Sequence, residues 1–411
     1  MNRKFLSTLA ILAVLLLAAA PLCAKPWGIV ATGADYYGTD NASLHVIDLG
    51  AVPPVVYGPF LQDYFINDEA LDIAMLPGNR KALVSAFLNQ QVHVVNLADP
   101  TNPVVERSFD LPFPAEDIAI SRNKKLALVT DGSGSSWVAF INLQKATANS
   151  IQLGEGKYAQ AVAIARNNVA MFADYFNGAI HYGKINKARN GLESVQTIAL
   201  CDAGQYDNAT DCMGPVGLPV NISISPDGKT ALVAPSNGGV VFVLKITNKG
   251  GVLPGEPFIL TGLPGGPLGE GNDGGQQSIS FQDKNTAYVV SQRRPLEAPG
   301  AVVVPGGIAF PGAEGDRPNQ LSLIRILGPG KAEFVAARYT LLNSPIYQYF
   351  GVDTLDIFNR YALAGNANDF ISPPYDNPYY NNVAFIDLIT GVLTPIELNN
   401  YGAAAGVAIK P

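Results

Sequence analysis

Basic residues are in the minority in this sequence, and the motifs of several enzyme classes are missing. The 27 Lys and Arg are outnumbered by 34 Asp and Glu, which gives a net charge of -7 at pH 7 and a pI near 5.1. Binding to nucleic acid through its phosphates needs a basic surface, so nucleic acid is not an expected partner. The sequence also has no Walker motif, nucleophile-elbow serine, dinucleotide fingerprint or metal-ligand cluster. No cofactor and no metal site are therefore assigned, and the sequence leaves open whether the protein is an enzyme.

Long apolar runs are absent except for one at the N-terminus. The basic residues of MNRK precede FLSTLAILAVLLLAAA, and PLCA follows, with the small residue Ala24 at the expected cleavage point. This order is typical of a cleaved signal peptide. A retained membrane anchor is the alternative, but the run is shorter than the roughly 20 residues that a spanning helix needs. We predict a signal peptide over residues 1–24 and a periplasmic or secreted mature chain, beginning at Lys25, without a membrane span.

Cysteine is nearly absent, with 3 residues in the whole chain. Cys23 is lost with the signal peptide, which leaves Cys201 and Cys212 in the segment CDAGQYDNATDC. In an exported protein, two cysteines so close in sequence most simply form one local disulfide. A zinc site would need histidine or further cysteine ligands, which this segment lacks. We therefore predict a disulfide between Cys201 and Cys212.

Helical patterns are missing after the N-terminal run, whereas short apolar strands recur along the whole chain. Gly (41) and Pro (30) are abundant, as in proteins built from many strands and turns. The first strand of the pattern recurs as DIAM (Asp72), DIAI (Asp117), AVAI (Ala161), NISI (Asn221), SISF (Ser278), TLDI (Thr354) and GVAI (Gly406). Second and third strands such as ALVSAF and VHVVNL follow, and a less distinct fourth strand completes each copy. Four strands in each of seven copies predict an all-β, seven-bladed β-propeller that forms one domain over residues 25–411.

The two ends of the repeated pattern complement each other. GIVATG near the N-terminus has no first strand before it, and the final GVAIKP has no second strand after it. We therefore predict that the C-terminal strand pairs with the N-terminal strands and completes one blade, because this pairing removes the open sheet edges of an unclosed ring.

Three stretches resemble known propeller repeats. VHVVNLADPTNPVV resembles the LVIVD repeat, whereas NISISPDGKTALVAPSNGGVVFVLKI and NVAFIDLITGVLTPIEL resemble the YVTN repeat. The resemblance covers essentially the whole mature chain and implies an exported repeat protein with the propeller fold. Similar blades occur in surface-layer proteins, lactonase-like enzymes and quinoprotein dehydrogenase subunits, so the resemblance implies no single activity. No lactonase-like or quinone-site motif is present to be carried over.

The three histidines occupy one equivalent position of the repeat. His45, His93 and His181 lie in third strands, where the other copies have Ala139, Phe242, Ser322 and Ala384. Small and large apolar side chains at one position are typical of a packing site. We therefore interpret the histidines as parts of the packing between blades, not as a shared metal or catalytic site.

The turns between first and second strands lie on one face of a propeller, which we name the lower face. Every blade contributes a cation to these turns, and the candidates are Arg80, Lys81, Arg122, Lys124, Lys125, Arg166, Lys229, Lys284, Arg360 and Lys410. Polar turns favour such residues for backbone reasons and for solubility. The alternative is that a basic ring steers an anionic ligand or partner.

The loops of the opposite face, the upper face, combine carboxylates with aromatic side chains. The candidate ligand-binding residues are Asp35, Tyr36, Glu69, Glu116, Trp137, Asp174, Tyr175, Asp353, Asp369 and Phe370. Rings supply contact area and acids supply orientation, as in many small-molecule and peptide sites. We predict a binding scaffold that recognises a protein or small-molecule partner through these loops. The alternative is a lactonase-like or other hydrolase that uses Glu69, Glu116, Asp174 or Asp353 around the central channel.

One insertion in the sixth copy contains its own short strands. RRPLEAPGAVVVPGGIAFPGAEGDRPNQ has AVVV and IAF on either side of PGG. This arrangement predicts an apolar hairpin with charged flanks.

Overall fold

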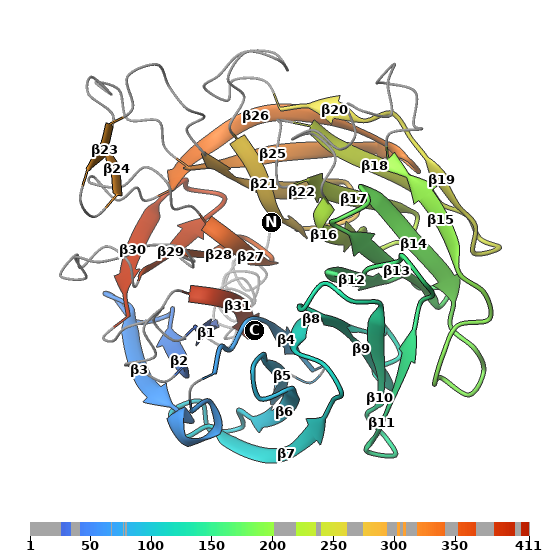
Figure 1. The fold of residues 1–411 in the computed structure, drawn as a ribbon. Helices are drawn as coiled ribbons and strands as arrows, with labels where there is room; N and C mark the ends of the chain where they lie inside the picture. Colours follow the sequence, from blue (N-terminus) through green and yellow to red (C-terminus); the bar gives the residue numbers. More distant parts are fainter. Residues whose placement is uncertain are drawn as a thin grey trace, which may run out of the picture.

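The computed structural model is a ring of seven antiparallel sheets around a central axis, which Figure 1 shows end on. The structure describes residues 26–33, 42–66, 68–76, 78, 80–200, 219–235, 240–260, 274–293, 302–304, 307–309, 319–341, 352–366, 382–398 and 404–410. Each sheet is a blade whose four strands follow one another from the axis outward, and one blade carries an additional short strand. The predicted seven-bladed propeller with four-stranded blades is confirmed.

The blades are numbered in chain order, and their strands are given from the axis outward. The first three blades are blade 1, with β31 (Ala404–Lys410), β1 (Trp27–Thr32), β2 (Ser43–Asp48) and β3 (Val55–Phe60); blade 2, with β4 (Ile73–Met75), β5 (Lys81–Ala86), β6 (Gln91–Asn96) and β7 (Val104–Asp110); and blade 3, with β8 (Ala115–Ile120), β9 (Leu126–Asp131), β10 (Trp137–Asn142) and β11 (Thr147–Gln152). A short 3-10 helix, η1 (Gln62–Tyr64), links blade 1 to blade 2.

The remaining blades follow the same plan. They are blade 4, with β12 (Ala161–Ile164), β13 (Val169–Asp174), β14 (Ala179–Lys184) and β15 (Gln196–Ala199); blade 5, with β16 (Pro219–Ile224), β17 (Thr230–Pro235), β18 (Val240–Ile246) and β19 (Val252–Pro254); blade 6, with β21 (Gly274–Phe281), β22 (Thr286–Arg293), β25 (Asn319–Gly328) and β26 (Lys331–Leu341); and blade 7, with β27 (Val352–Phe358), β28 (Tyr361–Asn366), β29 (Asn382–Asp387) and β30 (Leu393–Glu397). In blade 5, β20 (Phe258–Ile259) also pairs with β18.

The predicted hairpin in the insertion of blade 6 is present as a separate two-stranded sheet. β23 (Val302–Val304) pairs antiparallel with β24 (Gly307–Ala309). Figure 1 shows this hairpin outside the ring of blades.

The predicted closure of the ring is also confirmed. β31 pairs antiparallel with β1, from Trp27 opposite Lys410 to Thr32 opposite Ala404. The C-terminal strand is thus the innermost strand of blade 1, and it completes the four-stranded order of that blade. No helix among the described residues is long and apolar enough to cross a membrane. The predicted signal peptide over residues 1–24 and the predicted disulfide residues Cys201 and Cys212 lie outside the described residues.

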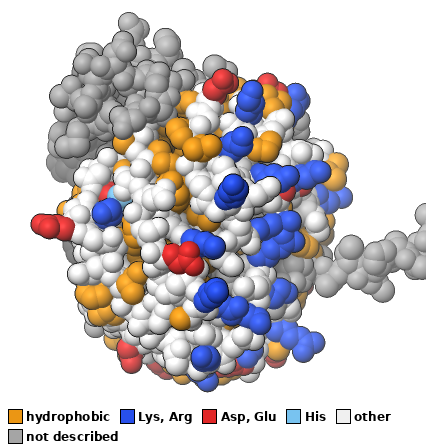
Figure 2. All heavy atoms as spheres, turned by 90° about the vertical axis from the view of Figure 1, so that its right-hand side faces the viewer, with side chains coloured by type: hydrophobic (Ala, Val, Ile, Leu, Met, Phe, Trp, Pro, Cys, Tyr) orange, Lys and Arg blue, Asp and Glu red, His pale blue; other side chains and the backbone are white. Residues whose placement is uncertain are grey.

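The lower face of the ring carries most of the chain's lysines and arginines. The strand order places the turns between first and second strands and those between third and fourth strands on the lower face. The second group adds cations to the ten of the first group, namely Lys145, Lys187, Arg189, Lys249 and Lys331. We call these fifteen residues the basic face. In Figure 2, Lys and Arg side chains gather on the right-hand side of the picture, with few acidic side chains among them.

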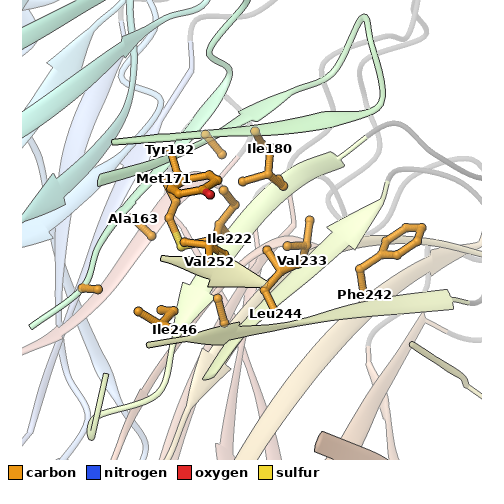
Figure 3. Packing of buried hydrophobic residues seen from close by; sticks show 14 of the residues in the cluster. Ala163, Met171, Ile180, Tyr182, Ile222, Val233, Phe242, Leu244, Ile246 and Val252 are labelled. Atoms are coloured by element: carbon orange, nitrogen blue, oxygen red, sulfur yellow. The ribbon is translucent and has the colours of Figure 1, made fainter. Parts of the chain in front are cut away.

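The hydrophobic core lies between neighbouring blades. The second strand of a blade is apolar on both sides, as LALVTD of β9 and VAMFAD of β13 show, and every residue of both strands is buried. A continuous apolar run fits a strand that is covered on both faces. Between blades 4 and 5, Met171 and Ile180 pack against Val233 and Phe242 (Figure 3). The blades are therefore held together by packing along their whole length.

Candidate functional site

A cavity of about 600 Å³ lies on the axis of the propeller. The first strand of every blade contributes to its wall. The polar side chains of the wall are Asp72, Glu116, Asp117, Gln160, Asn221, Ser278, Thr354 and Asp356. Because strand residues alternate between faces, the apolar residues between them, such as Ile73 and Ile118, extend into the core between blades.

Two aspartates of the wall connect neighbouring blades. The Ile118 N–H donates to Asp72 Oδ2 at 2.9 Å, and the Val162 N–H donates to Asp117 Oδ2 at 2.6 Å. Asp117 Oδ1 also accepts the N–H of Ile118 at 2.9 Å. Each carboxylate therefore links the first strand of its own blade to the first strand of the next.

The same link recurs elsewhere in the ring with different residues. In blade 5, Asn221 Oδ1 accepts the Ile279 N–H of blade 6 at 3.2 Å. In blade 7, Asp356 Oδ2 accepts the Ile409 N–H of blade 1 at 2.7 Å. Blade 5 is thus linked to the next blade through an amide side chain, whereas blades 2, 3 and 7 are linked through carboxylates.

Burial makes the carboxyl groups of the wall hard to ionise. Burial raises the pKa of Asp117 from 3.8 to about 6, although the N–H of Val162 opposes the shift. Burial also raises the pKa of Asp72 well above its ordinary value, and the charge of Asp117 raises it further. Asp356 has a raised pKa because it is buried. Desolvation disfavours the charged form of a carboxyl group, so these shifts share one physical cause. A hydrogen bond between the two carboxyl groups raises the pKa of Asp72 and lowers that of Asp117.

Glu116 brings a further carboxylate to the wall beside Asp117. The amide Nε2 of Gln160 donates to Glu116 Oε1 at 3.3 Å. The charge of Glu116 contributes to the raised pKa of Asp117. On the upper side, the ring of Phe87 lies over Gly132, where a Cβ atom would be 2.2 Å from the ring and 3.0 Å from Glu116 Oε2. A glycine at position 132 is therefore required for this close approach.

An aromatic cluster lies on the upper face at blade 4. The ring of Phe176 lies 5.0 Å from that of Tyr158 and 5.5 Å from that of Tyr175, measured between centroids. Both pairs are edge to face, which is a favourable geometry for aromatic rings. Phe176 is 53% exposed and covers Gly134 of the neighbouring loop in blade 3. This cluster therefore presents apolar surface at the upper end of the propeller.

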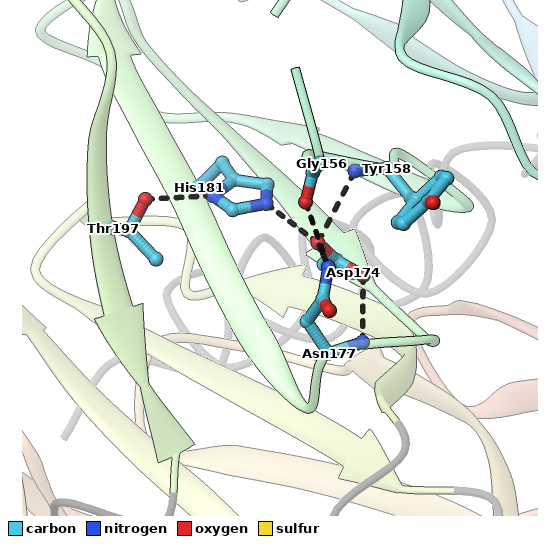
Figure 4. A network of polar contacts seen from close by, with 6 residues as sticks. All are labelled: Gly156, Tyr158, Asp174, Asn177, His181 and Thr197. Atoms are coloured by element: carbon cyan, nitrogen blue, oxygen red, sulfur yellow. Dashed lines mark hydrogen bonds and ion pairs between the residues drawn. The ribbon is translucent and has the colours of Figure 1, made fainter. Parts of the chain in front are cut away.

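Asp174 is held inside a polar network below this cluster (Figure 4). Asp174 Oδ2 contacts His181 Nε2 at 2.7 Å and accepts hydrogen bonds from Asn177 Nδ2 at 2.8 Å and from the Tyr158 N–H at 3.1 Å. The other ring nitrogen of His181 contacts Thr197 Oγ1 at 2.9 Å. Burial alone would raise the pKa of Asp174, but these hydrogen bonds outweigh it and lower the pKa. The network fixes the upper loop of blade 4.

The three histidines are buried, as packing residues are expected to be, but His181 also belongs to the polar network of Asp174. His45, His93 and His181 lie in blades 1, 2 and 4, and each is at most 2% exposed. His93 Nδ1 contacts Ser108 Oγ at 2.8 Å, and its ring lies 5.2 Å from that of Phe65. Burial lowers the pKa of His45 and of His93 to about 4, so both are neutral at pH 7. The described part of the chain has no group of three or more His, Cys, Asp or Glu that could hold a metal ion.

The predicted ligand-binding residues have different positions in the structure. Glu116 lines the cavity, whereas Asp174 is fully buried in its network. Glu69 is half-buried, Trp137 packs against the core between blades 2 and 3, and Tyr175 belongs to the aromatic cluster. The side chain of Asp353 lies outside the described residues, as do Asp35, Tyr36, Asp369 and Phe370.

Asp72, Asp117, Asp356 and Gln160 line the cavity but were not among the predicted site residues. Asp72 and Asp117 are the first residues of the repeated motifs DIAM and DIAI. Their signal was a carboxylate at the start of an innermost strand, where alternation directs one side chain toward the axis and the next into the core.

Comparisons with known proteins support the architecture. No protein-family model matches the sequence, and no curated protein matches it. Among solved structures, the chain is similar to the periplasmic gluconolactonase PpgL of Pseudomonas aeruginosa, with 13% identity over 94% of this chain and 99% of that chain and a TM-score of 0.60. A putative 6-phosphogluconolactonase of Bacteroides fragilis gives 11% identity, coverage of 94% and 99%, and a TM-score of 0.61. A functionally unknown protein of Desulfotomaculum acetoxidans gives 14% identity, coverage of 93% and 98%, and a TM-score of 0.58. At these identities the likeness shows the propeller fold alone.

Proposed function

We propose that this chain is an exported propeller that binds a small hydroxylated molecule in its central channel, entered from the upper face. The observation that carries the proposal is the cavity of about 600 Å³, whose wall takes polar side chains from six of the seven blades. Ligand sites typically have volumes of about 300–1,000 Å³ and a few polar groups that orient the ligand. The aromatic cluster of Tyr158, Tyr175 and Phe176 adds a contact surface on the upper face.

The chemistry of the wall suits hydroxyl groups better than it suits a strong cation. Asp117, with a pKa of about 6, and Asp72, with a higher pKa than usual, ionise less readily than ordinary carboxyl groups. A protonated carboxyl donates a hydrogen bond and a carboxylate accepts one. A hydroxyl group does both, and Gln160, Asn221, Ser278 and Thr354 offer further donors and acceptors. A polyol or a sugar is therefore the ligand class that we assign to the cavity.

We also propose that the blades are of the YVTN and LVIVD repeat types, and that residues 1–24 are removed during export to the periplasm or the medium. Residues 25–411 then form one domain. The expected disulfide between Cys201 and Cys212 braces the connection into blade 5. N-terminal sequencing of the exported protein is expected to begin at Lys25, and alkylation before reduction is expected to label neither cysteine.

The binding proposal is tested by thermal shift with a panel of sugars, polyols, aldonolactones and alkyl amines. A ligand at 100 times its Kd stabilises the folded state by about 2.7 kcal/mol. The same shift is expected to be much smaller for Glu116→Gln, which changes one hydrogen-bond acceptor of the wall. A ligand that stabilises both proteins equally binds elsewhere, and a preference for amines would contradict the assignment to hydroxylated ligands.

A lactonase-like hydrolase is the second candidate function. The observation in its favour is that Glu116 and Asp117, whose pKa is about 6, share one cavity. Two of the similar structures have lactonase names, which supports this candidate at the level of fold only. Binding is preferred because the carboxyl groups of Asp72, Asp117 and Asp356 are engaged with backbone N–H groups of the next blade. The test is acid release from an aldonolactone. Release by the unaltered protein but not by Glu116→Gln would favour the hydrolase.

A further inference from the structure

The basic face collects most of the chain's 27 lysines and arginines, although the whole chain is acidic. Arg122, Arg166, Lys229 and Lys284 lie in inner turns of four blades and are exposed. Lys249 and Lys331 extend the same face to outer turns. The cations are therefore distributed around the whole ring instead of forming one cluster.

Few of these cations are neutralised within the part of the chain that the structure describes. Among the described residues, the ion pairs of the basic face are Lys81 with Glu106 and Arg360 with Asp387. Near the axis, burial lowers the pKa of Lys410, and the charge of Arg80 lowers it further. The charge of Asp99 opposes this shift of the Lys410 pKa, and Asp227 and Asp283 lie in the same set of turns, but the fifteen cations outnumber these acids and the face keeps an excess of positive charge.

Exposed aliphatic side chains lie on the outer rim of the same face. Val52 is 98% exposed and Ile389 is 73% exposed, and both belong to turns between third and fourth strands. Val104, Leu253, Leu327 and Val392 are at least half exposed in the same or adjoining positions. Apolar tips from five blades therefore project beside the cations, on the face where the chain enters the propeller at Trp27.

From this combination we infer that the lower face docks on the surface of an anionic lipid bilayer. Lipid headgroups attract the cations, and the aliphatic tips enter the boundary between headgroups and acyl chains. A soluble polyanion would use the cations but would gain nothing from Val52 or Ile389. Both groups lie in turns of the same face of the propeller, so one surface could contact them together. This inference does not depend on the ligand of the channel, because it concerns the opposite face.

The experiment is cosedimentation of the protein, purified from cells that express the full chain, with vesicles of phosphatidylcholine alone or mixed with phosphatidylglycerol. Binding is expected only to the anionic vesicles and is expected to weaken with salt. Arg122→Gln with Lys229→Gln removes two exposed cations, each worth about 1 kcal/mol at such a surface, so the affinity falls about thirtyfold. Arg107→Gln with Lys157→Gln, which neutralises two cations outside the basic face, is the matched control and leaves the affinity unchanged.

A second variant distinguishes a bilayer from a soluble polyanion. Val52→Ser with Ile389→Ser keeps every charge and is expected to weaken vesicle binding about tenfold. Binding to polyphosphate in solution is expected to be equal for this variant and the unaltered protein. Equal vesicle binding by both proteins would show that the face recognises anionic charge alone and would overturn the bilayer assignment. Binding to neutral vesicles, or no vesicle binding at low salt, would overturn the inference as a whole. The replaced side chains are exposed, except that of Lys157, which is half-buried. An unchanged melting temperature confirms that each variant is folded.

Discussion

Replacing Asp117 by Asn is expected to reduce the loss of folding stability that occurs as the pH rises from 4 to 8. Asp117 lies in the channel wall and holds the Val162 N–H of the next blade at 2.6 Å. Its pKa in the folded protein is about 6, against an ordinary value of 3.8, because burial disfavours the carboxylate. A carboxyl group whose pKa is raised by folding stabilises the protein below pH 4, and this contribution is lost as pH rises through 6. The unaltered protein therefore loses stability over that interval.

The magnitude follows from the two pKa values. The difference of about two pH units corresponds to about 3 kcal/mol at about 1.4 kcal/mol per unit. Asparagine resembles the protonated acid, since it keeps one oxygen acceptor and has no ionisation to lose. The two proteins should differ by less than about 1 kcal/mol at pH 4, and the variant should be more stable by about 2–3 kcal/mol at pH 8. Asp72 adds to the gain of the variant at pH 8. Its pKa falls when the charge of Asp117 is removed, so its own ionisation costs less folding stability.

The assay is urea unfolding followed by tryptophan fluorescence at a series of pH values from 4 to 8. The quantity of interest is the difference in free energy of unfolding between the variant and the unaltered protein. Asp63→Asn, at an exposed carboxylate of η1, is the control and should leave the pH dependence unchanged. If the stability curves of Asp117→Asn and the unaltered protein run parallel across this interval, the buried charge carries no penalty and the reasoning is wrong.

Three further predictions follow from the same contacts. Asn221→Asp introduces a carboxylate at the equivalent link of blade 5, so it should destabilise the protein by about 3 kcal/mol more at pH 8 than at pH 4, as urea unfolding would detect. His181→Phe removes the partner that holds Asp174 in its buried network and should lower the free energy of unfolding by about 2–4 kcal/mol, whereas an effect below 1 kcal/mol would contradict the role of the network. Gly132→Ala places a Cβ 2.2 Å from the ring of Phe87, so it should cost about 1–3 kcal/mol in a thermal or urea melt, and an unchanged melt would show that the ring moves freely.

The fold was predictable because each blade repeats one local pattern. The recurrence of DIAM, DIAI and NISI identified the first strand of each copy, and the unmatched ends of the repeated pattern predicted the pairing of β1 with β31. No contact between distant residues had to be known for either step.

The site was less predictable because it depends on what each carboxylate contacts. Asp174 was expected in an exposed loop, but it is the last residue of β13, it is buried, and His181 of β14 contacts it. Asp117 stands in an apolar motif, yet it accepts an N–H from a strand 45 residues further along the chain. Such partners are set by the packing of one blade on another, and the spacing of residues within one blade contains no information about it.

The closing strand has a consequence for the order in which the protein can fold during synthesis. Blades 2 to 7 each draw their four strands from one continuous stretch, so each can form soon after it is made. Blade 1 cannot, because β1 is made first and must wait for β31, whose sequence follows all the other blades. In the interval the apolar strand WGIVAT has an unpaired edge, which is available to other chains. A factor that shields this edge during synthesis would therefore raise the yield of folded protein more than one that acts on any other blade.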